Sequence, residues 1–165
     1  MLVPFEELSP QSRLWIYASK TRFTEDQKNS IKEELDTFTE SWEAHGASLM
    51  ASYRIEHEHF IVIAVDEGYH AASGCSIDKS VQVIRTIESR ASIDLMDRMV
   101  AFIPKYDNIE VYTMNGLKPA IEAGLLTVEN QVFDNSISSI EQYKNEWLKP
   151  VGATWLLRYF PSVFK

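Results

Sequence analysis

The chain has 165 residues, of which 45% are hydrophobic and 12% aromatic. This length and composition exclude an intrinsically disordered protein and favour one domain with a substantial core. Its 24 acidic residues outnumber its 16 basic residues, for a formal net charge of -8. Because the basic residues are also scattered, we expect no nucleic-acid partner and no binding to an anionic membrane.

The cysteine content and the N-terminal residues indicate the cellular compartment of the protein. Cys75 is the only cysteine, so an intrachain disulfide and a multi-cysteine metal site are excluded and a reducing compartment is favoured. Residues 1–10 lack the basic and apolar stretches of a secretory signal, and no apolar run is long enough to span a membrane. We therefore expect a cytoplasmic protein with no membrane association.

The first predicted elements are a strand and a helix. Residues 13–18 are rich in β-branched and aromatic side chains, which predicts a strand. Thr24 followed by Gln27 is the pattern of a capping box, and it predicts a helix that ends near Gly46. Apolar residues recur along this helix at helical spacing, namely Ile31, Leu35, Phe38 and Trp42.

Two strands and a second helix are predicted next. Residues 49–56 partly alternate, and residues 60–65 are apolar without interruption, which predicts a central strand buried on both faces. The polar residues 56–59 between them predict a hairpin tip. After a loop over 66–75, Ser76 is expected to cap a helix with an apolar stripe formed by Ile77, Val81, Ile84 and Ile87.

Two further predicted strands complete the sheet. Residues 100–103 and 109–114 flank the turn signal at 104–108. The resulting order, β-α-β-β-α-β, is that of a split βαβ or ferredoxin-like domain. We therefore predict an α+β fold with a mainly antiparallel sheet of about five strands, formed by residues 1–115 of a single domain.

Residues 116–165 are predicted to form a helical extension packed on that sheet. A short helix over 117–123 ends at Gly124, a longer helix over 136–148 ends before Pro150, and residues 155–160 are apolar without a clear type. A ferredoxin-like sheet leaves one face open. Either the C-terminal helices cover that face, or two copies pair through it as a homodimer.

The segment 71–80, Ala-Ala-Ser-Gly-Cys-Ser-Ile-Asp-Lys-Ser, joins the predicted central strand to the second helix. Phosphate-binding loops lie at such junctions. A Walker A motif requires glycine at the positions of Ser73 and Asp78, and the Asp78 carboxylate also lies beside Lys79, the lysine that would hold phosphate. No downstream strand ends in an aspartate for magnesium, so the segment does not predict nucleotide hydrolysis.

Four stretches of the chain carry a resemblance to known sequences. They are Arg13-Leu-Trp-Ile-Tyr, residues 38–49 with Trp42, Ala44-His45-Gly46 and Leu49, Val65-Asp66-Glu67, and Ser73-Gly-Cys-Ser-Ile-Asp-Lys-Ser80. They resemble a family of small, uncharacterised bacterial proteins, some of which carry a transporter-ATPase label. The resemblance covers most of the first two-thirds of the chain. It implies a small cytosolic bacterial protein and implies no particular activity or catalytic residue.

Cys75 is the sharpest candidate for chemistry. It lies just before the helix that Ser76 is expected to cap, where free N–H groups and the helix dipole stabilise a thiolate. A nucleophilic Cys75 would take His70 as its base, with Asp66 or Asp78 to orient that histidine. The alternative is that Cys75 is a small packed residue at a tight helix start, which is the commoner role of a lone cysteine.

The same segment is the candidate ligand site. We assign ligand binding to the residues around the predicted helix start, which are Glu67, Ser73, Gly74, Ser76, Asp78 and Lys79. The carboxylates of this segment could serve as acid-base groups or metal ligands. The simpler interpretation is that they are solvated loop residues. We expect no metal and no cofactor. His57 and His59 are two apart, as metal ligands on one strand would be, although a hairpin tip is more often a solvated turn.

Asp97-Arg98, after residues 93–96, is a further polar pair. It is either a surface ion pair or an anchor for an anion. Taken together, the residues favour a binding or regulatory domain without chemistry, which acts through a protein partner, a second copy or a small ligand near residues 66–78. The alternative is a small enzyme that uses Cys75 as nucleophile in acyl or thiol transfer.

Overall fold

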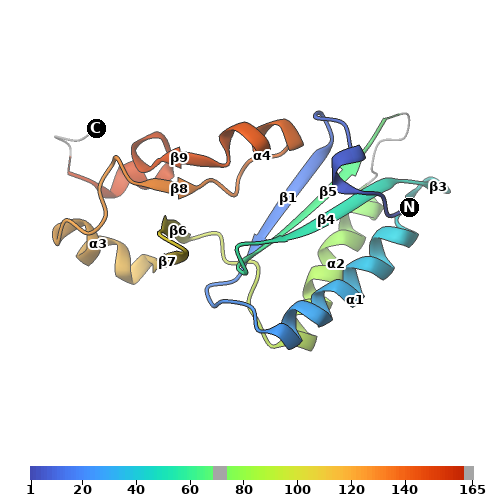
Figure 1. Cartoon of the computed structure of the whole chain (residues 1–165), viewed down its shortest axis with the longest axis horizontal. Helices are drawn as coiled ribbons and strands as arrows, with labels where there is room; N and C mark the ends of the chain where they lie inside the picture. Colours follow the sequence, from blue (N-terminus) through green and yellow to red (C-terminus); the bar gives the residue numbers. More distant parts are fainter. Residues whose placement is uncertain (69–73, 162–165) are drawn as a thin grey trace.

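The structure is a computed structural model that describes residues 1–68 and 74–161. Figure 1 shows an elongated molecule with two lobes. The sheet lobe holds the N-terminal half of the chain, and the hairpin lobe holds β6 to β9 with α3 and the last 3₁₀ helices. The α+β class predicted from the sequence is therefore confirmed.

The sheet lobe is built on three strands, β1 (Arg13–Ala18), β4 (Met50–Glu56) and β5 (Phe60–Asp66). β5 lies between β1 and β4 and is antiparallel to both. All of its residues except Asp66 are buried, as the uninterrupted apolar run predicted. The 56–59 region also turns as predicted, because residues 57–59 form the tip between β4 and β5.

Helix α1 (Glu25–Ser41) begins at the predicted capping box. The Thr24 hydroxyl accepts a hydrogen bond from Gln27 N at 3.1 Å, and the Gln27 side chain accepts one from Thr24 N at 3.0 Å. The helix ends before Gly46, because the next residues form a small hairpin of β2 (Glu43–Ala44) and β3 (Ala47–Ser48).

Helices α1 and α2 (Gly74–Ala91) lie on one side of the sheet, and α4 (Ile140–Glu146) lies on the other (Figure 1). On the first side, Ile31 and Leu35 of α1 and Ile84 and Ile87 of α2 share one core cluster with Ile61 and Ile63 of β5. The stripe predicted for α1 therefore faces the sheet, and the stripe predicted for α2 does so at Ile84 and Ile87, whereas Ile77 and Val81 are outside this cluster.

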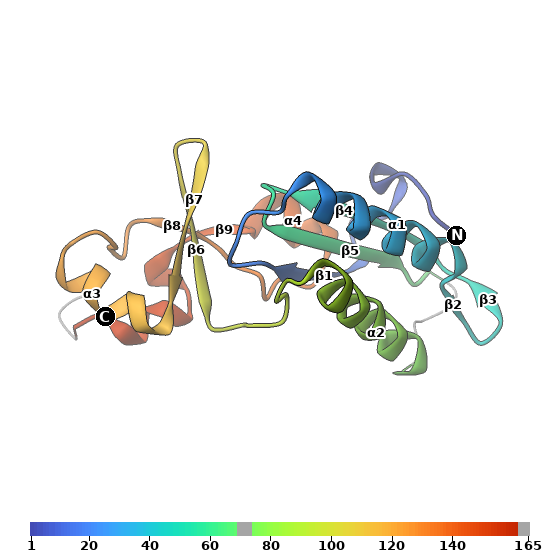
Figure 2. The same cartoon turned by 90° about the horizontal axis from the view of Figure 1, so that it is seen from below.

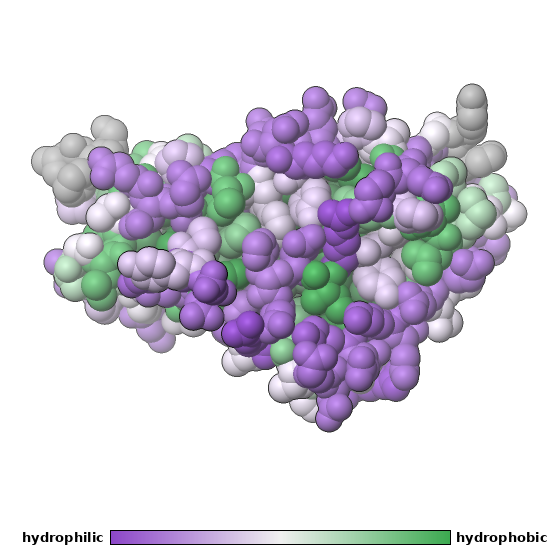
Figure 3. Space-filling view, viewed as in Figure 1, coloured by the Kyte–Doolittle hydropathy of each residue, from purple (hydrophilic) through white to green (hydrophobic). Residues whose placement is uncertain are grey.

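The second face of the sheet is covered by both ends of the chain. Its core cluster includes residues before β1 and residues after β5, namely Val3, Phe5, Leu8, Val100, Phe102, Phe133, Ile137, Ile140 and Trp147. Coverage by the C-terminal part, one of the two alternatives, is thus confirmed. This face of the sheet is therefore not open for pairing with a second copy. Figure 3 shows one side of the molecule, on which hydrophobic surface occurs only in separate patches.

The prediction of a sheet of about five strands is wrong, and a ferredoxin-like fold is not confirmed. Among the described residues the largest sheet has three strands. The order β1, α1, β4, β5 matches the start of a split βαβ fold, since β4 runs parallel to β1 with β5 between them. The next strand, β6 (Val100–Lys105), would have to pair with β1, but it pairs with β7 (Asn108–Thr113) instead.

The hairpin lobe has its own core. Its remaining elements are α3 (Met114–Glu122), β8 (Gln131–Phe133), β9 (Leu148–Pro150), η2 (Val151–Ala153) and η3 (Trp155–Tyr159). They enclose a cluster of Ala101, Ile103, Leu117, Ala120, Leu126, Val132, Val151, Leu156 and Phe160. Figure 2 shows the β6–β7 hairpin standing out from this lobe.

The C-terminal predictions are confirmed in part. Helix α3 is present where a short helix was predicted, and Gly124 follows it at a φ of 72°. The predicted helix over 136–148 is wrong in its first part, because α4 begins only at Ile140. Residues 135–136 form a turn instead, and Ser139 then forms a bridge with Arg13 of β1, where Leu14 N donates a hydrogen bond to Ser138 O at 3.0 Å. The Ser139 hydroxyl then caps α4 by accepting from Gln142 N.

Candidate functional site

The acidic residues predicted for the site have structural partners nearby. Asp66 is the last residue of β5, and its carboxylate accepts a hydrogen bond from Gly68 N at 2.9 Å. Glu67 forms an ion pair with Arg13 at 3.0 Å. The bonded turn at Asp66 and the ion pair at Glu67 agree with the simpler interpretation of solvated loop carboxylates.

The helix start differs from the prediction. Helix α2 begins at Gly74, so Cys75 and Ser76 lie within its first turn, and the prediction that Ser76 precedes and caps the helix is wrong. His70 and Ser73 lie outside the described residues, as do the side chains of Cys75 and Ser76. Asp78 and Lys79 are exposed on α2. The assignment of these residues to one ligand site stays a prediction.

The reactivity of Cys75 is open to a direct test. A thiolate stabilised by the first turn of α2 is expected to react with iodoacetamide at a rate that stays high well below pH 8.5, the ordinary pKa of a thiol. The measurement is the alkylation rate of the folded protein against pH, with the urea-unfolded chain as reference. Protection of Cys75 until unfolding would instead identify it as a packed residue.

The two histidines at the β4–β5 tip have separate surroundings. The His57 ring packs against Phe133 and Trp147, with ring centroids 5.0 and 5.8 Å apart. His59 is buried, and its Nδ1 lies 2.9 Å from Ser19 O. No group of three or more potential metal ligands occurs among residues 1–68 and 74–161. The backbone of residues 57–59 forms the predicted turn, although His59 is buried.

A groove beside β1 is a candidate site formed by the described residues. It has a volume of about 490 Å³, which lies in the range of small-molecule sites. We call it the β1-edge groove. Its walls are β1, residues 95–102 and residues 133–138, and Trp155 and Arg158 of η3 complete it. The site therefore lies between the two lobes and draws on segments far apart in the sequence.

The backbone of β1 is bonded at both ends of the groove and open between them. Leu14 N donates to Ser138 O at 3.0 Å, and Ala18 N donates to Leu95 O at 3.4 Å. Because the direction of N–H groups alternates along a strand, Ile16 N–H also points away from β5. Its own carbonyl accepts a hydrogen bond from Arg98 Nη1 at 2.8 Å, but its N–H has no acceptor within the described part of the chain.

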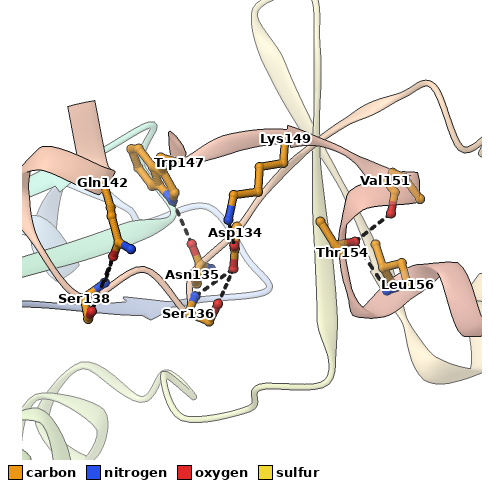
Figure 4. A network of polar contacts seen from close by, with 10 residues as sticks. All are labelled: Asp134, Asn135, Ser136, Ser138, Gln142, Trp147, Lys149, Val151, Thr154 and Leu156. Carbon is orange, nitrogen blue, oxygen red and sulfur yellow. Dashed lines mark hydrogen bonds and ion pairs between the residues drawn. The ribbon is translucent and has the colours of Figure 1, made fainter. Parts of the chain in front are cut away.

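A hydrogen-bond network fixes the wall formed by residues 133–138 (Figure 4). The Asp134 carboxylate accepts hydrogen bonds from Lys149 at 2.6 Å and from Ser136 N at 3.0 Å. The Asn135 side chain accepts one from Trp147 Nε1 at 2.9 Å. These bonds join the wall to β9 and to the end of α4, so the groove is preformed in the folded chain.

The Asp134 carboxyl is ionised within this wall. Its side chain is only 14% exposed, and burial by itself raises its pKa. The hydrogen bonds from Lys149 and Ser136 outweigh that effect and lower the pKa below its ordinary value. The negative charge of Asp134 is thus neutralised locally by Lys149 and is not free to bind a cation.

Sequence reasoning singled out two residues of this groove, Asp97 and Arg98. Arg98 was assigned either to an ion pair with Asp97 or to an anion anchor. Asp97 pairs with Lys20 at 3.1 Å, and the Arg98 guanidinium bonds to Ile16 O and lies 5.4 Å over the Tyr17 ring. Arg98 is thus bonded to the strand, and its role as an anion anchor stays a prediction. Ile16, Asn135 and Arg158 were missed, since no local motif marks them.

Comparison with known proteins gives no guide to this site. No protein-family model, no curated protein and no solved structure matches the chain. In the described ranges, no helix is both long enough and apolar enough to cross a membrane.

Proposed function

We propose that this protein is a binding domain that takes up a small ligand in the β1-edge groove. The observation that carries the proposal is the groove itself, which combines a volume of about 490 Å³, mostly apolar walls and a stretch of the β1 edge that pairs with no other strand in the described part of the chain. Ligand sites typically unite apolar walls with a few fixed polar groups. Glu67, from the segment singled out in the sequence, forms an ion pair with Arg13, which lines the groove.

A fragment screen tests the proposal. Small aromatic and aliphatic compounds are expected to shift the backbone amide resonances of β1 and residues 95–102 of the 15N-labelled protein. Met99 lines the groove and is 45% exposed, so Met99→Trp is expected to fill part of it and weaken binding about tenfold. Met114→Trp, at an exposed residue outside the groove, is the matched control and should bind as the original chain does.

The remaining proposals rest on the sequence. Membership of the family of small bacterial proteins is supported by the segment 73–80, and a cytoplasmic location by the lone cysteine. An enzyme that uses Cys75 for acyl or thiol transfer is the alternative function. We also propose that the protein acts through a homodimer or another protein partner. A ferredoxin-like fold of the sheet lobe is a further proposal, which the order β1, α1, β4, β5 supports.

A further inference from the structure

The charges that line the β1-edge groove are unequally neutralised. Both acidic residues have cationic partners, since Asp97 pairs with Lys20 at 3.1 Å and Asp134 pairs with Lys149 at 2.6 Å. Among the three arginines, Arg13 pairs with Glu67. The remaining two arginines, Arg98 and Arg158, leave the groove with excess positive charge.

Arg98 and Arg158 have no acidic partner in the described residues, and both are exposed. Arg98 uses one of its five N–H donors on Ile16 O, and the Arg158 side chain has no hydrogen bond within residues 1–68 and 74–161. Acidic residues outnumber basic ones by 24 to 16 in this chain. Two uncompensated cations in one groove of an acidic protein therefore indicate a site for an anion.

Ile16 supplies an independent observation. The residue is 1% exposed, yet its N–H has no acceptor among residues 1–68 and 74–161. A buried donor without an acceptor is unfavourable, and such donors are rare in folded proteins. The Arg98 guanidinium lies next to this amide, because it is bonded to the carbonyl of the same residue at 2.8 Å. The two donors are thus adjacent on the strand edge.

We propose that the β1-edge groove binds an organic carboxylate with an apolar body. One carboxylate oxygen accepts from Ile16 N–H, the other accepts from Arg98, and Arg158 adds a second positive charge at the rim. The apolar body lies against the hydrophobic part of the lining, which includes Leu14, Val100, Phe102, Phe133, Ile137 and Trp155. This assignment rests on the proposed function, because it names the ligand class of the same groove.

Matched pairs of probes test the assignment. Hexanoate, octanoate and 4-phenylbutyrate are titrated at pH 7 into the 15N-labelled full chain, each beside the primary alcohol of the same skeleton. We expect at least one carboxylate to bind at least tenfold more tightly than its alcohol and to shift the Ile16 amide proton, which gains an acceptor. Arg98→Gln is expected to weaken that carboxylate about tenfold, and Arg158→Gln about threefold.

Arg85→Gln is the matched control, because Arg85 is exposed on α2, away from the groove lining, and its loss should change affinity less than twofold. Arg158→Gln keeps the β1 edge intact, so it tests charge selection even if Arg98→Gln fails to fold. Equal affinity for alcohols and carboxylates would overturn the carboxylate assignment and leave ligand binding standing. Displacement by equimolar inorganic phosphate would also overturn it. Absence of groove shifts with all six probes would overturn both proposals.

Discussion

Replacing Phe60 by alanine is expected to lower the free energy of unfolding by about 3–5 kcal/mol, the usual cost of removing a buried phenylalanine ring. Phe60 is fully buried at the start of β5. Its ring lies 5.1, 4.9 and 5.1 Å from those of Phe102, Phe133 and Trp147. The large cost is expected because the surrounding rings belong to different segments and cannot collapse together into the cavity.

Urea unfolding monitored by tryptophan fluorescence and by circular dichroism measures this effect. Tyr106→Ala is the control, since Tyr106 is 97% exposed at the tip of the β6–β7 hairpin, and its loss should change stability by less than about 0.5 kcal/mol. Phe60 also connects the sheet to residues of the C-terminal part. A cost below about 1.5 kcal/mol for Phe60→Ala would show that this aromatic cluster is not what holds the two parts together.

The elements predicted correctly are those with a local signal. The capping box at Thr24 fixes the start of α1 because its two hydrogen bonds join residues three apart. The run over 60–65 identifies β5 because a strand buried on both faces needs no polar positions. Both signals depend on neighbours in the sequence, so they can be interpreted without knowledge of the tertiary structure.

The errors arise where a distant segment decides the outcome. Ile137, Ile140 and Trp147 are buried in one cluster, which is compatible with one face of a helix. Ile137 nevertheless lies before α4, between the turn at 135–136 and the residues that bond to the N-terminal part, since Leu14 N donates to Ser138 O and Ile140 N donates to Ser12 O. The same pairing occupies the end of the β1 edge where a further sheet strand would add, so one nonlocal contact accounts for both the shortened helix and the smaller sheet.

The candidate site was predicted only in part for the same reason. Ile16 belongs to the site because its amide has no acceptor in the described part of the chain. This depends on the tertiary bonds that Leu14 and Ala18 make on either side of it. Arg98 was singled out for its charge, and the structure supplies the groove beside it. Residues 66–79 were emphasised because they form a recognisable segment, whereas the groove is assembled from four separate ones.

Lys149→Met is expected to destabilise the protein at pH 7 by about 2 kcal/mol, because it leaves a largely buried carboxylate without its cation. The Asp134 and Lys149 side chains are 14% and 31% exposed, and their charged atoms lie 2.6 Å apart. The matched variant is Asp134→Asn, which keeps the shape of the side chain and removes the charge. The double variant completes a mutant cycle, and urea unfolding of all four chains gives the coupling free energy.

The pH dependence of the same pair has a definite sign. Because the folded-state pKa of Asp134 lies below its ordinary value of 3.8, the stabilisation it provides is present above that value and is lost as the pH falls through the folded-state pKa. The stability difference between the original chain and Asp134→Asn should therefore be full at pH 7 and shrink below pH 3.8. Parallel stability curves for the two chains from pH 7 to that acidic range would contradict an ionised, paired Asp134.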